Sequence, residues 1–405
     1  MRTPSIQQLT FVTVVLLLWA GYFVFGPRHG LDSGSYVRFG NILIEWITVH
    51  FPNGLPMRND VLFPNYIIPS LFIAIPYHFF GQTGHQIIIG LNILLFANVV
   101  RSLVAIWQNL EIGSQLKLIA PLLAALLLTH GLLDVPLWVY YDLSDIIFLF
   151  IVMLVASLSI EAVVAQRNRL LLMALAIALL AFFARPTAII LPILCVAFFT
   201  LRINPNHFGW VGWLSIICAT LFTIGVVLGM PLLIETWVEQ PNFRRQIPAF
   251  LSQTIRQSAF FYQNGWVVAD RPETFFHNPS GYLDYLLITL KRLAYYFIPL
   301  REGYSLRHNL LNCAYFLVVG YFYCIGIRHL WSLDPQGKRL IIVLVFFTLL
   351  FGLMHAITLN SYDWRYQLPA MIPFWILAGI GLLNTPRIVN LFQTERHATN
   401  SNPNE

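Results

Sequence analysis

The feature that most constrains this chain is a series of apolar segments of about 20 residues, the length of helix that crosses the hydrocarbon core of a bilayer. Hydrophobic residues fill 58% of the 405 positions and charged residues only 10%, which excludes a water-soluble domain and a disordered chain. We therefore predict an all-α, polytopic transmembrane helical bundle with about ten spans. The predicted spans are 9–26, 85–107, 116–133, 143–165, 169–184, 187–202, 208–233, 309–330, 339–359 and 367–384.

The orientation of the bundle follows from Lys and Arg near the span ends, because these residues prefer the cytoplasmic side. This rule places both termini inside, with one transmembrane domain over 1–384 and a polar cytoplasmic tail over 385–405. Two outer regions remain, at about 27–84 and 234–308. In the first region, the segment 61–80 carries three prolines. We expect it to form broken helices at the outer interface, since a full span there would move the basic loops outside.

Asp32 is the first candidate functional residue, in the segment DSGSYVR just after the first span. Ionisable residues beside the bilayer are costly and therefore candidates for function. A carboxylate here can serve as a general base if it reaches the acceptor nucleophile. The alternative is that Asp32 caps a helix that begins at this point. Tyr36 and Arg38 follow and are expected to contact substrate, with Arg38 as a partner of Asp32 or a phosphate contact.

A second acidic group lies in the segment YYDLSD, at the predicted outer end of the third and fourth spans. Asp142 and Asp145 are three residues apart, on one face of a helix, and could together hold a divalent cation. Capping of a helix N-terminus by Asp142 is the other interpretation. No other cofactor is expected.

Arg185, in the segment FFARPT between two predicted spans, suits either a lipid phosphate or a helix C-terminus, where a cation is favourable. Before the final span, Asp363 and Arg365 in SYDWRYQLPA either neutralise each other or bind substrate together with Tyr366.

The long outer region is unusually basic, which suggests an anionic ligand at the outer face. Its basic residues are Arg244, Arg245, Arg256, Arg271, Lys291, Arg292, Arg301 and Arg307. The adjacent guanidinium groups of Arg244 and Arg245 repel each other unless an anion joins them.

Four motifs together resemble the GT-C superfamily of polytopic glycosyltransferases, which includes the protein mannosyltransferases and the lipid A aminoarabinose transferases. They are the acid after the first span, the proline-punctuated segment ending near FG, the RPT turn, and the final RY-x-LPA-x-x-PF-x-x-LAG run. The likeness follows order and spacing over most of the chain. It assigns no branch, because the first-loop acid lacks a DE pair and no KPP precedes the second span.

The resemblance implies an inverting transfer of a sugar from a polyprenyl-phosphate donor to a lipid, glycan or protein acceptor. Asp32 would be the base, and Arg185, Arg244, Arg245 and Arg365 would hold the donor phosphate. This phosphate is already a good leaving group, so the site needs fixed positive charge rather than the second carboxyl of a glycosidase. Membrane lipids are expected partners and nucleic acid is not. The expected location is a bacterial inner membrane, with the site on the periplasmic face.

Two other functions remain open. An O-antigen-type polymerase or ligase would also have many spans and an Arg-rich outer loop, but Arg and His of that loop would dominate its activity. A lipid or solute transporter would tolerate loss of Asp32. Against the transporter, the halves show no internal repeat, and the acids cluster at one face instead of the bilayer midplane.

Overall fold

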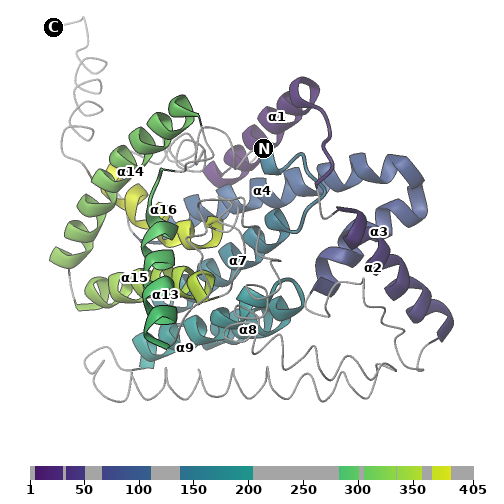
Figure 1. Cartoon of the computed structure of the whole chain (residues 1–405). Helices are drawn as coiled ribbons and strands as arrows, with labels where there is room; N and C mark the ends of the chain where they lie inside the picture. Colours follow the sequence, from purple (N-terminus) through teal and green to yellow (C-terminus); the bar gives the residue numbers. More distant parts are fainter. Residues whose placement is uncertain are drawn as a thin grey trace, which may run out of the picture.

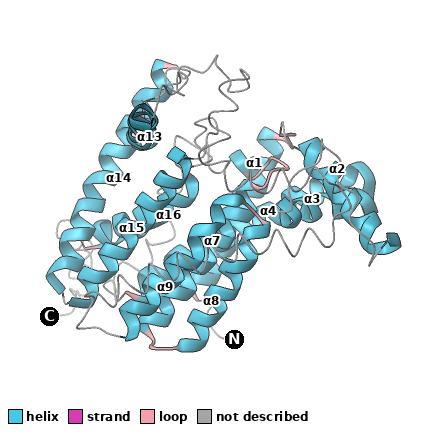
Figure 2. Cartoon of the chain, turned by 60° about the horizontal axis from the view of Figure 1, so that its bottom comes forward, coloured by secondary structure: helices cyan, strands magenta, loops and turns pink. Residues whose placement is uncertain are grey.

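The computed structural model describes residues 5–30, 33–50, 66–110, 137–203, 282–300, 305–333, 335–357 and 367–384. Within these ranges the chain is helical, and the one extended pairing is a single bridge between Arg28 and Tyr141. Figure 2 shows the helices packed along one another, with α2 and α3 gathered at one end. The predicted all-α class is confirmed for this part of the chain.

Eight of the ten predicted spans coincide with helices. They are α1 (Ile6–Phe25), α4 (Gly84–Asn109), α7 (Asp145–Val164), α8 (Asn168–Leu180), α9 (Ile190–Ile203), α14 (Leu306–Leu333), α15 (Pro335–Ile357) and α16 (Leu368–Leu383). The other two, 116–133 and 208–233, fall outside the described residues.

Four helical stretches among the described residues are long and apolar enough to cross a membrane, which supports a multi-pass membrane protein. They are Ile6–Phe25, Ile67–Asn109, Asp145–Val164 and Leu306–Ser332. The ten-span count and its orientation stay predictions.

The first predicted outer region contains two helices that pack on each other, α2 (Ser33–Glu45) and α3 (Ile67–Phe80). A π-helical turn, Trp46–His50, extends α2, and a 3₁₀ turn, Gly81–Thr83, joins α3 to α4. At their crossing, a Cβ on Gly40 would overlap the Cβ of Ala74 and the carbonyl oxygen of Ser70, so only glycine permits this approach. In Figure 1 the pair lies to the right, beside α4. Helices were expected in this region, but the expected break at the prolines of 61–80 is wrong for α3, which continues through Pro69 and Pro76. The depth of α2 and α3 in the membrane stays a prediction.

The last part of the predicted long outer region contains a helix. Residues Tyr282–Phe297 form α13, which packs against α15. Arg292 is fully buried and donates a hydrogen bond to the carbonyl oxygen of His355 at 3.3 Å, whereas the adjacent Lys291 is exposed. An amphipathic helix mixes polar and apolar residues, so its sequence lacks the apolar run of a span, and the helix was not recognised within the predicted outer region.

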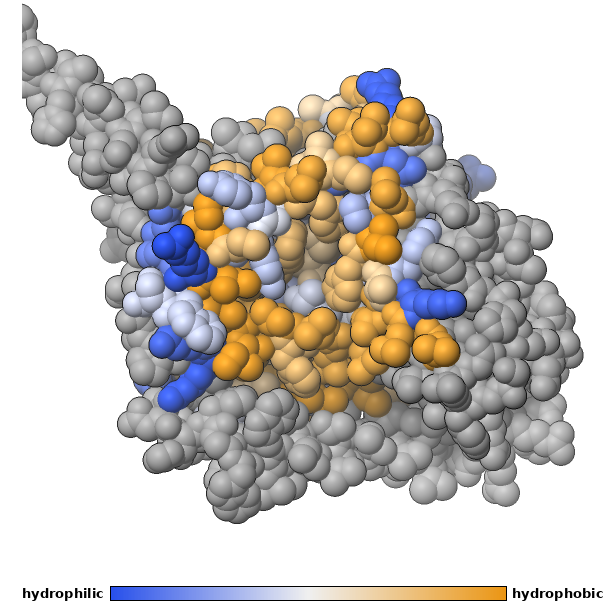
Figure 3. Space-filling model, turned by 60° about the vertical axis from the view of Figure 1, so that its left-hand side comes forward, coloured by the Kyte–Doolittle hydropathy of each residue, from blue (hydrophilic) through white to orange (hydrophobic). Residues whose placement is uncertain are grey.

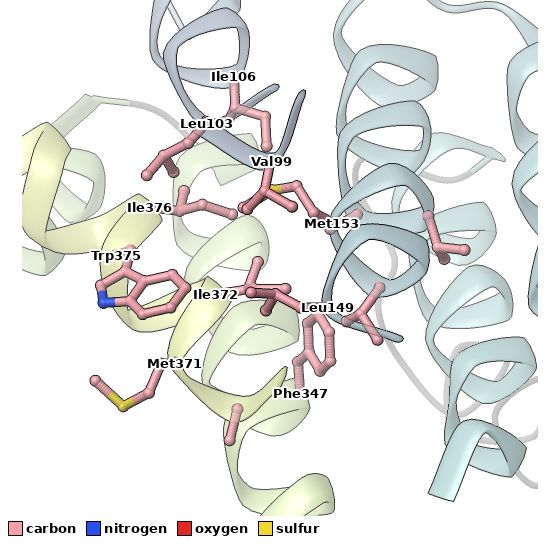
Figure 4. Packing of buried hydrophobic residues seen from close by; sticks show 14 of the residues in the cluster. Val99, Leu103, Ile106, Leu149, Met153, Phe347, Met371, Ile372, Trp375 and Ile376 are labelled. Atoms are coloured by element: carbon pink, nitrogen blue, oxygen red, sulfur yellow. The ribbon is translucent and has the colours of Figure 1, made fainter. Parts of the chain in front are cut away.

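The core is centred on α16, which contacts α4, α7, α14 and α15. Figure 4 shows its apolar side chains meeting those of α4, α7 and α15; the labelled residues are Val99, Leu103, Ile106, Leu149, Met153, Phe347, Met371, Ile372, Trp375 and Ile376. The two buried indoles each have a hydrogen-bond acceptor. Trp107 donates to the carbonyl oxygen of Ile376 at 3.1 Å, and Trp375 donates to the hydroxyl of Tyr315 at 2.9 Å. These bonds replace the hydrogen bonds to water that the two indole N–H groups lose on burial.

Large apolar side chains also cover the outside of the bundle. On α1 and α14, Leu16, Phe23, Leu317 and Leu306 are more than half exposed. Figure 3 shows a broad apolar face, hollowed near its middle and bordered by hydrophilic residues, on the side of the molecule that carries α14. Exposed apolar area of this extent is costly in water, and it fits contact with lipid chains.

Candidate functional site

The C-terminal end of α1, the start of α2 and the segment before α7 meet beside α4. Hydrogen bonds to backbone carbonyl groups hold them there. The N–H of Arg28, in the linker after α1, donates to the carbonyl oxygen of Tyr140 at 2.8 Å. The amide of Asn92, on α4, donates to the carbonyl oxygens of Val139 at 3.3 Å and Tyr141 at 2.9 Å. The segment that precedes α7 is therefore held against the start of α2 and the first half of α4.

Asp142 lies at the centre of this junction and is fully buried. Its Oδ1 accepts hydrogen bonds from the N–H of Gly30 at 3.0 Å and from the hydroxyl of Ser33. Its Oδ2 lies 3.1 Å from the hydroxyl of Tyr77 and 3.0 Å from Nδ1 of His29. Burial alone would raise the pKa of this carboxyl, but the hydrogen bonds from Ser33, Gly30 and His29 outweigh it and hold the pKa below its ordinary value. Asp142 is therefore an anion at neutral pH.

Two histidines complete a compact group with Asp142. The rings of His29 and His85 are 4.0 Å apart between centroids and tilted by 31°. One ligand atom from each histidine and one Asp142 oxygen all lie within 4.8 Å of one another. The side chain of His29 is 66% exposed, whereas His85 is only 7% exposed. Imidazole nitrogens and a carboxylate at this spacing are able to bind a metal ion.

Asp145 belongs to a second network, next to the first. Its Oδ1 pairs with Nη2 of Arg185 at 2.6 Å, and the same guanidinium donates to Oγ of Ser144 at 3.1 Å and lies 5.7 Å from the ring centre of Phe148. Oγ of Ser144 also lies 2.9 Å from the hydroxyl of Tyr36, on α2. Burial, chiefly, raises the pKa of Tyr36, so its hydroxyl stays neutral and able to donate.

A third polar group, made of Arg292, His355 and Gln367, lies at the same end of the bundle. All three side chains are buried, and the Gln367 amide donates to the carbonyl oxygen of Tyr296. The ring of Phe351, one turn before His355, lies 6.4 Å from that of Phe148. This contact links the third group to the Arg185 network.

The structure thus joins three of the predicted groups: Tyr36 from the first loop, Asp142 and Asp145, and Arg185. It separates the two acids, because Asp142 faces the histidines and Asp145 faces Arg185. Arg38 lies exposed on α2. α2 begins at Ser33. The remaining predicted residues, Asp32, Arg244, Arg245, Asp363, Arg365 and Tyr366, lie outside the described residues.

Sequence reasoning missed His29 and His85, since a single histidine near an apolar segment has no distinguishing pattern. A signal did exist in the predicted topology, which puts positions 29, 85 and 142 at the outer ends of three different spans. The chain matches no family model, no curated protein and no solved structure, so the site is interpreted from its own geometry.

Proposed function

We propose that the protein is an inverting glycosyltransferase that moves a sugar from a polyprenyl-phosphate donor to a lipid, glycan or protein acceptor at the outer face of a bacterial inner membrane. The observation that carries this proposal is the junction around Asp142. Gly30 and Ser33, which lie on either side of Asp32 in sequence, both bond to Asp142, and Tyr36 on the next turn bonds to Ser144 beside Arg185. The acid-bearing first loop is thus attached to the polar end of the bundle.

In the proposed transfer, Asp32 acts on the acceptor hydroxyl and fixed positive charge acts on the donor phosphate. Asp32 takes the proton from the acceptor hydroxyl, whose oxygen forms a bond to the anomeric carbon of the sugar. On the opposite face, the bond from that carbon to the phosphate oxygen breaks, and polyprenyl phosphate leaves with the electron pair. Inversion follows from this opposed geometry. No acid is needed for the leaving group, so fixed positive charge is the main requirement.

Arg185 contributes less of that charge than its position in the sequence indicates, because Asp145 already pairs with it. Its role is therefore to hold the side chain of Ser144 in place and, through Ser144, that of Tyr36. The basic residues Arg244, Arg245 and Arg365 remain the proposed phosphate contacts. The exposed apolar surface of α14 offers an isoprenoid tail a lipid-side approach to the bundle.

The test is transfer of labelled sugar from a panel of polyprenyl-phosphate sugars into membrane lipid or glycan, by the wild type and by Asp32→Asn. This substitution keeps the shape of the side chain and removes the base. We expect a loss of roughly 100-fold or more, the size of a general-base contribution. Glu45→Gln is the matched control, since Glu45 is an exposed carboxylate at the end of α2 and should leave transfer unchanged.

Equal transfer by the wild type and Asp32→Asn would assign Asp32 to the helix cap and contradict this mechanism. Absence of transfer from every donor would favour the polymerase or ligase, for which a lipid-pyrophosphate oligosaccharide is the next substrate to assay. It would also favour the transporter, for which uptake into vesicles is the measurement.

A further inference from the structure

We propose that His29, His85 and Asp142 form a binding site for one divalent transition-metal ion, with Zn²⁺ as the best match. The proposal is independent of sugar transfer, because it depends only on the ligand set. Three potential ligand atoms, one from each residue, lie within 4.8 Å of one another, and Nδ1 of His29 lies 3.0 Å from Oδ2 of Asp142. Two ligands of one zinc ion, each about 2.0–2.2 Å from it, have a comparable separation.

His85 provides the second, independent observation. The residue is only 7% exposed, yet Nε2 has no hydrogen-bond partner in the part of the chain that the structure describes. Buried imidazole nitrogens normally have a partner, because an unsatisfied polar atom costs about 1–3 kcal/mol. A metal ion would satisfy Nε2, and it would also explain why the two ring centroids lie only 4.0 Å apart beside one carboxylate.

The surroundings of Asp142 resemble the outer shell of a metal site. The N–H of Gly30 and the hydroxyl of Ser33 hold Oδ1, which leaves Oδ2 directed to His29 and Tyr77. Such partners orient a ligating carboxylate and are worth about 10- to 100-fold in metal affinity. Asn92 fixes the backbone on the N-terminal side of Asp142. The ligand is therefore preorganised.

The donor set decides the class of ion. Two imidazoles and one carboxylate suit Zn²⁺ and its neighbours, whereas Mg²⁺ and Ca²⁺ prefer oxygen ligands. Three protein ligands leave a coordination position open, and the 66% exposure of the His29 side chain gives water or a ligand oxygen access to it. Binding would replace the contact between Nδ1 of His29 and Oδ2 of Asp142, since both atoms would then face the metal ion.

The experiment uses the full chain, purified in detergent without a polyhistidine tag, stripped with a chelator and titrated with Zn²⁺ and Co²⁺. We expect one ion per chain, no competition from excess Mg²⁺ or Ca²⁺, and a Co²⁺ absorption spectrum typical of imidazole and oxygen ligands. His85→Gln should abolish this binding, and Ser33→Ala should weaken it by about 10- to 100-fold. His78→Gln is the matched control, because His78 is an exposed histidine on α3.

Absence of stoichiometric Zn²⁺ binding by the wild type would overturn the proposal and leave a plain hydrogen-bond contact between His29 and Asp142. Equal loss of affinity in His85→Gln and His78→Gln would also overturn it. Should His85→Gln fail to elute as a monodisperse protein, X-ray absorption of the zinc-loaded wild type decides. Two imidazole ligands on the zinc ion would support the site. A zinc ion without imidazole ligands would contradict it.

Discussion

At the scale of single residues, we expect the buried ion pair between Asp145 and Arg185 to be sensitive to mutation. The two side chains are 2% and 10% exposed, and Nη2 lies 2.6 Å from Oδ1. Asp145→Asn should lower the free energy of unfolding by about 3–5 kcal/mol, because it leaves a buried guanidinium without its counter-charge. Thermal unfolding in detergent measures this loss.

Glu45→Gln is the control for that measurement. Glu45 and His50 are 3.9 Å apart and their side chains are 69% and 48% exposed, so loss of their contact should change stability by less than about 1 kcal/mol. The double variant Asp145→Leu with Arg185→Met should recover most of the loss, since a buried pair can be replaced by apolar groups of similar volume. A double variant no more stable than Asp145→Asn would show that the pair has a different role.

The candidate site was only partly predictable from the sequence. Asp142 and Arg185 stand out because a charged residue at the edge of an apolar segment is costly and easily noticed. Their actual partners do not stand out, since Ser33, His29 and Tyr77 reach Asp142 from positions 65 or more residues away. Local spacing suggested that Asp142 would pair with Asp145, but tertiary packing directs the two carboxylates to opposite partners.

At the scale of helices, α14 and α16 approach each other so closely that only glycine fits between them. A Cβ on Gly381 would overlap the carbonyl oxygen of Phe322, and a Cβ on Gly326 would overlap that of Leu377. Gly381→Ala should therefore push the helices apart and cost about 1–3 kcal/mol or more. The measurement is the thermal unfolding midpoint in detergent.

Gly320→Ala, also on α14, is the matched control. Nothing lies within 4 Å of a Cβ built at this position, so alanine should be neutral or slightly stabilising through its higher helix propensity. A midpoint for Gly381→Ala equal to that of Gly320→Ala would contradict the close crossing.

Helices made almost entirely of apolar residues were easy to predict from the sequence. Helices that mix polar and apolar residues were not. The spans over α7 and α16 were placed to within a few residues, because almost every side chain in them is apolar. α13 was not predicted, since Lys291 and Arg292 interrupt the apolar run of its sequence. α3 forms a helix in spite of Pro76, with α2 packed along it.

For the whole molecule, the contact between His29 and Asp142 constrains membrane topology. The end of α1 and the start of α7 must lie at the same face, so the chain between them crosses the membrane an even number of times and α4 cannot be the sole crossing. Single cysteines at Ser5 and Asn168 should therefore react with an impermeant thiol reagent from one side, and a cysteine at Pro27 from the other.

These three positions are exposed, and the four native cysteines would be replaced by serine before labelling. Reaction of Ser5→Cys and Asn168→Cys from opposite sides would contradict the shared face of His29 and Asp142. Reaction of Pro27→Cys from the outer side would in addition support the predicted orientation.

The same contact has a consequence for biosynthesis. His29 and Asp142 are 113 residues apart, a distance that a ribosome takes on the order of ten seconds to translate at about 5–20 residues per second. Throughout that interval the linker after α1 lacks its partners Tyr140 and Asp142, and water satisfies the polar groups that later bond to them. The nascent linker must therefore wait in an aqueous compartment, and a substitution that drew it into lipid would block assembly before α7 emerged.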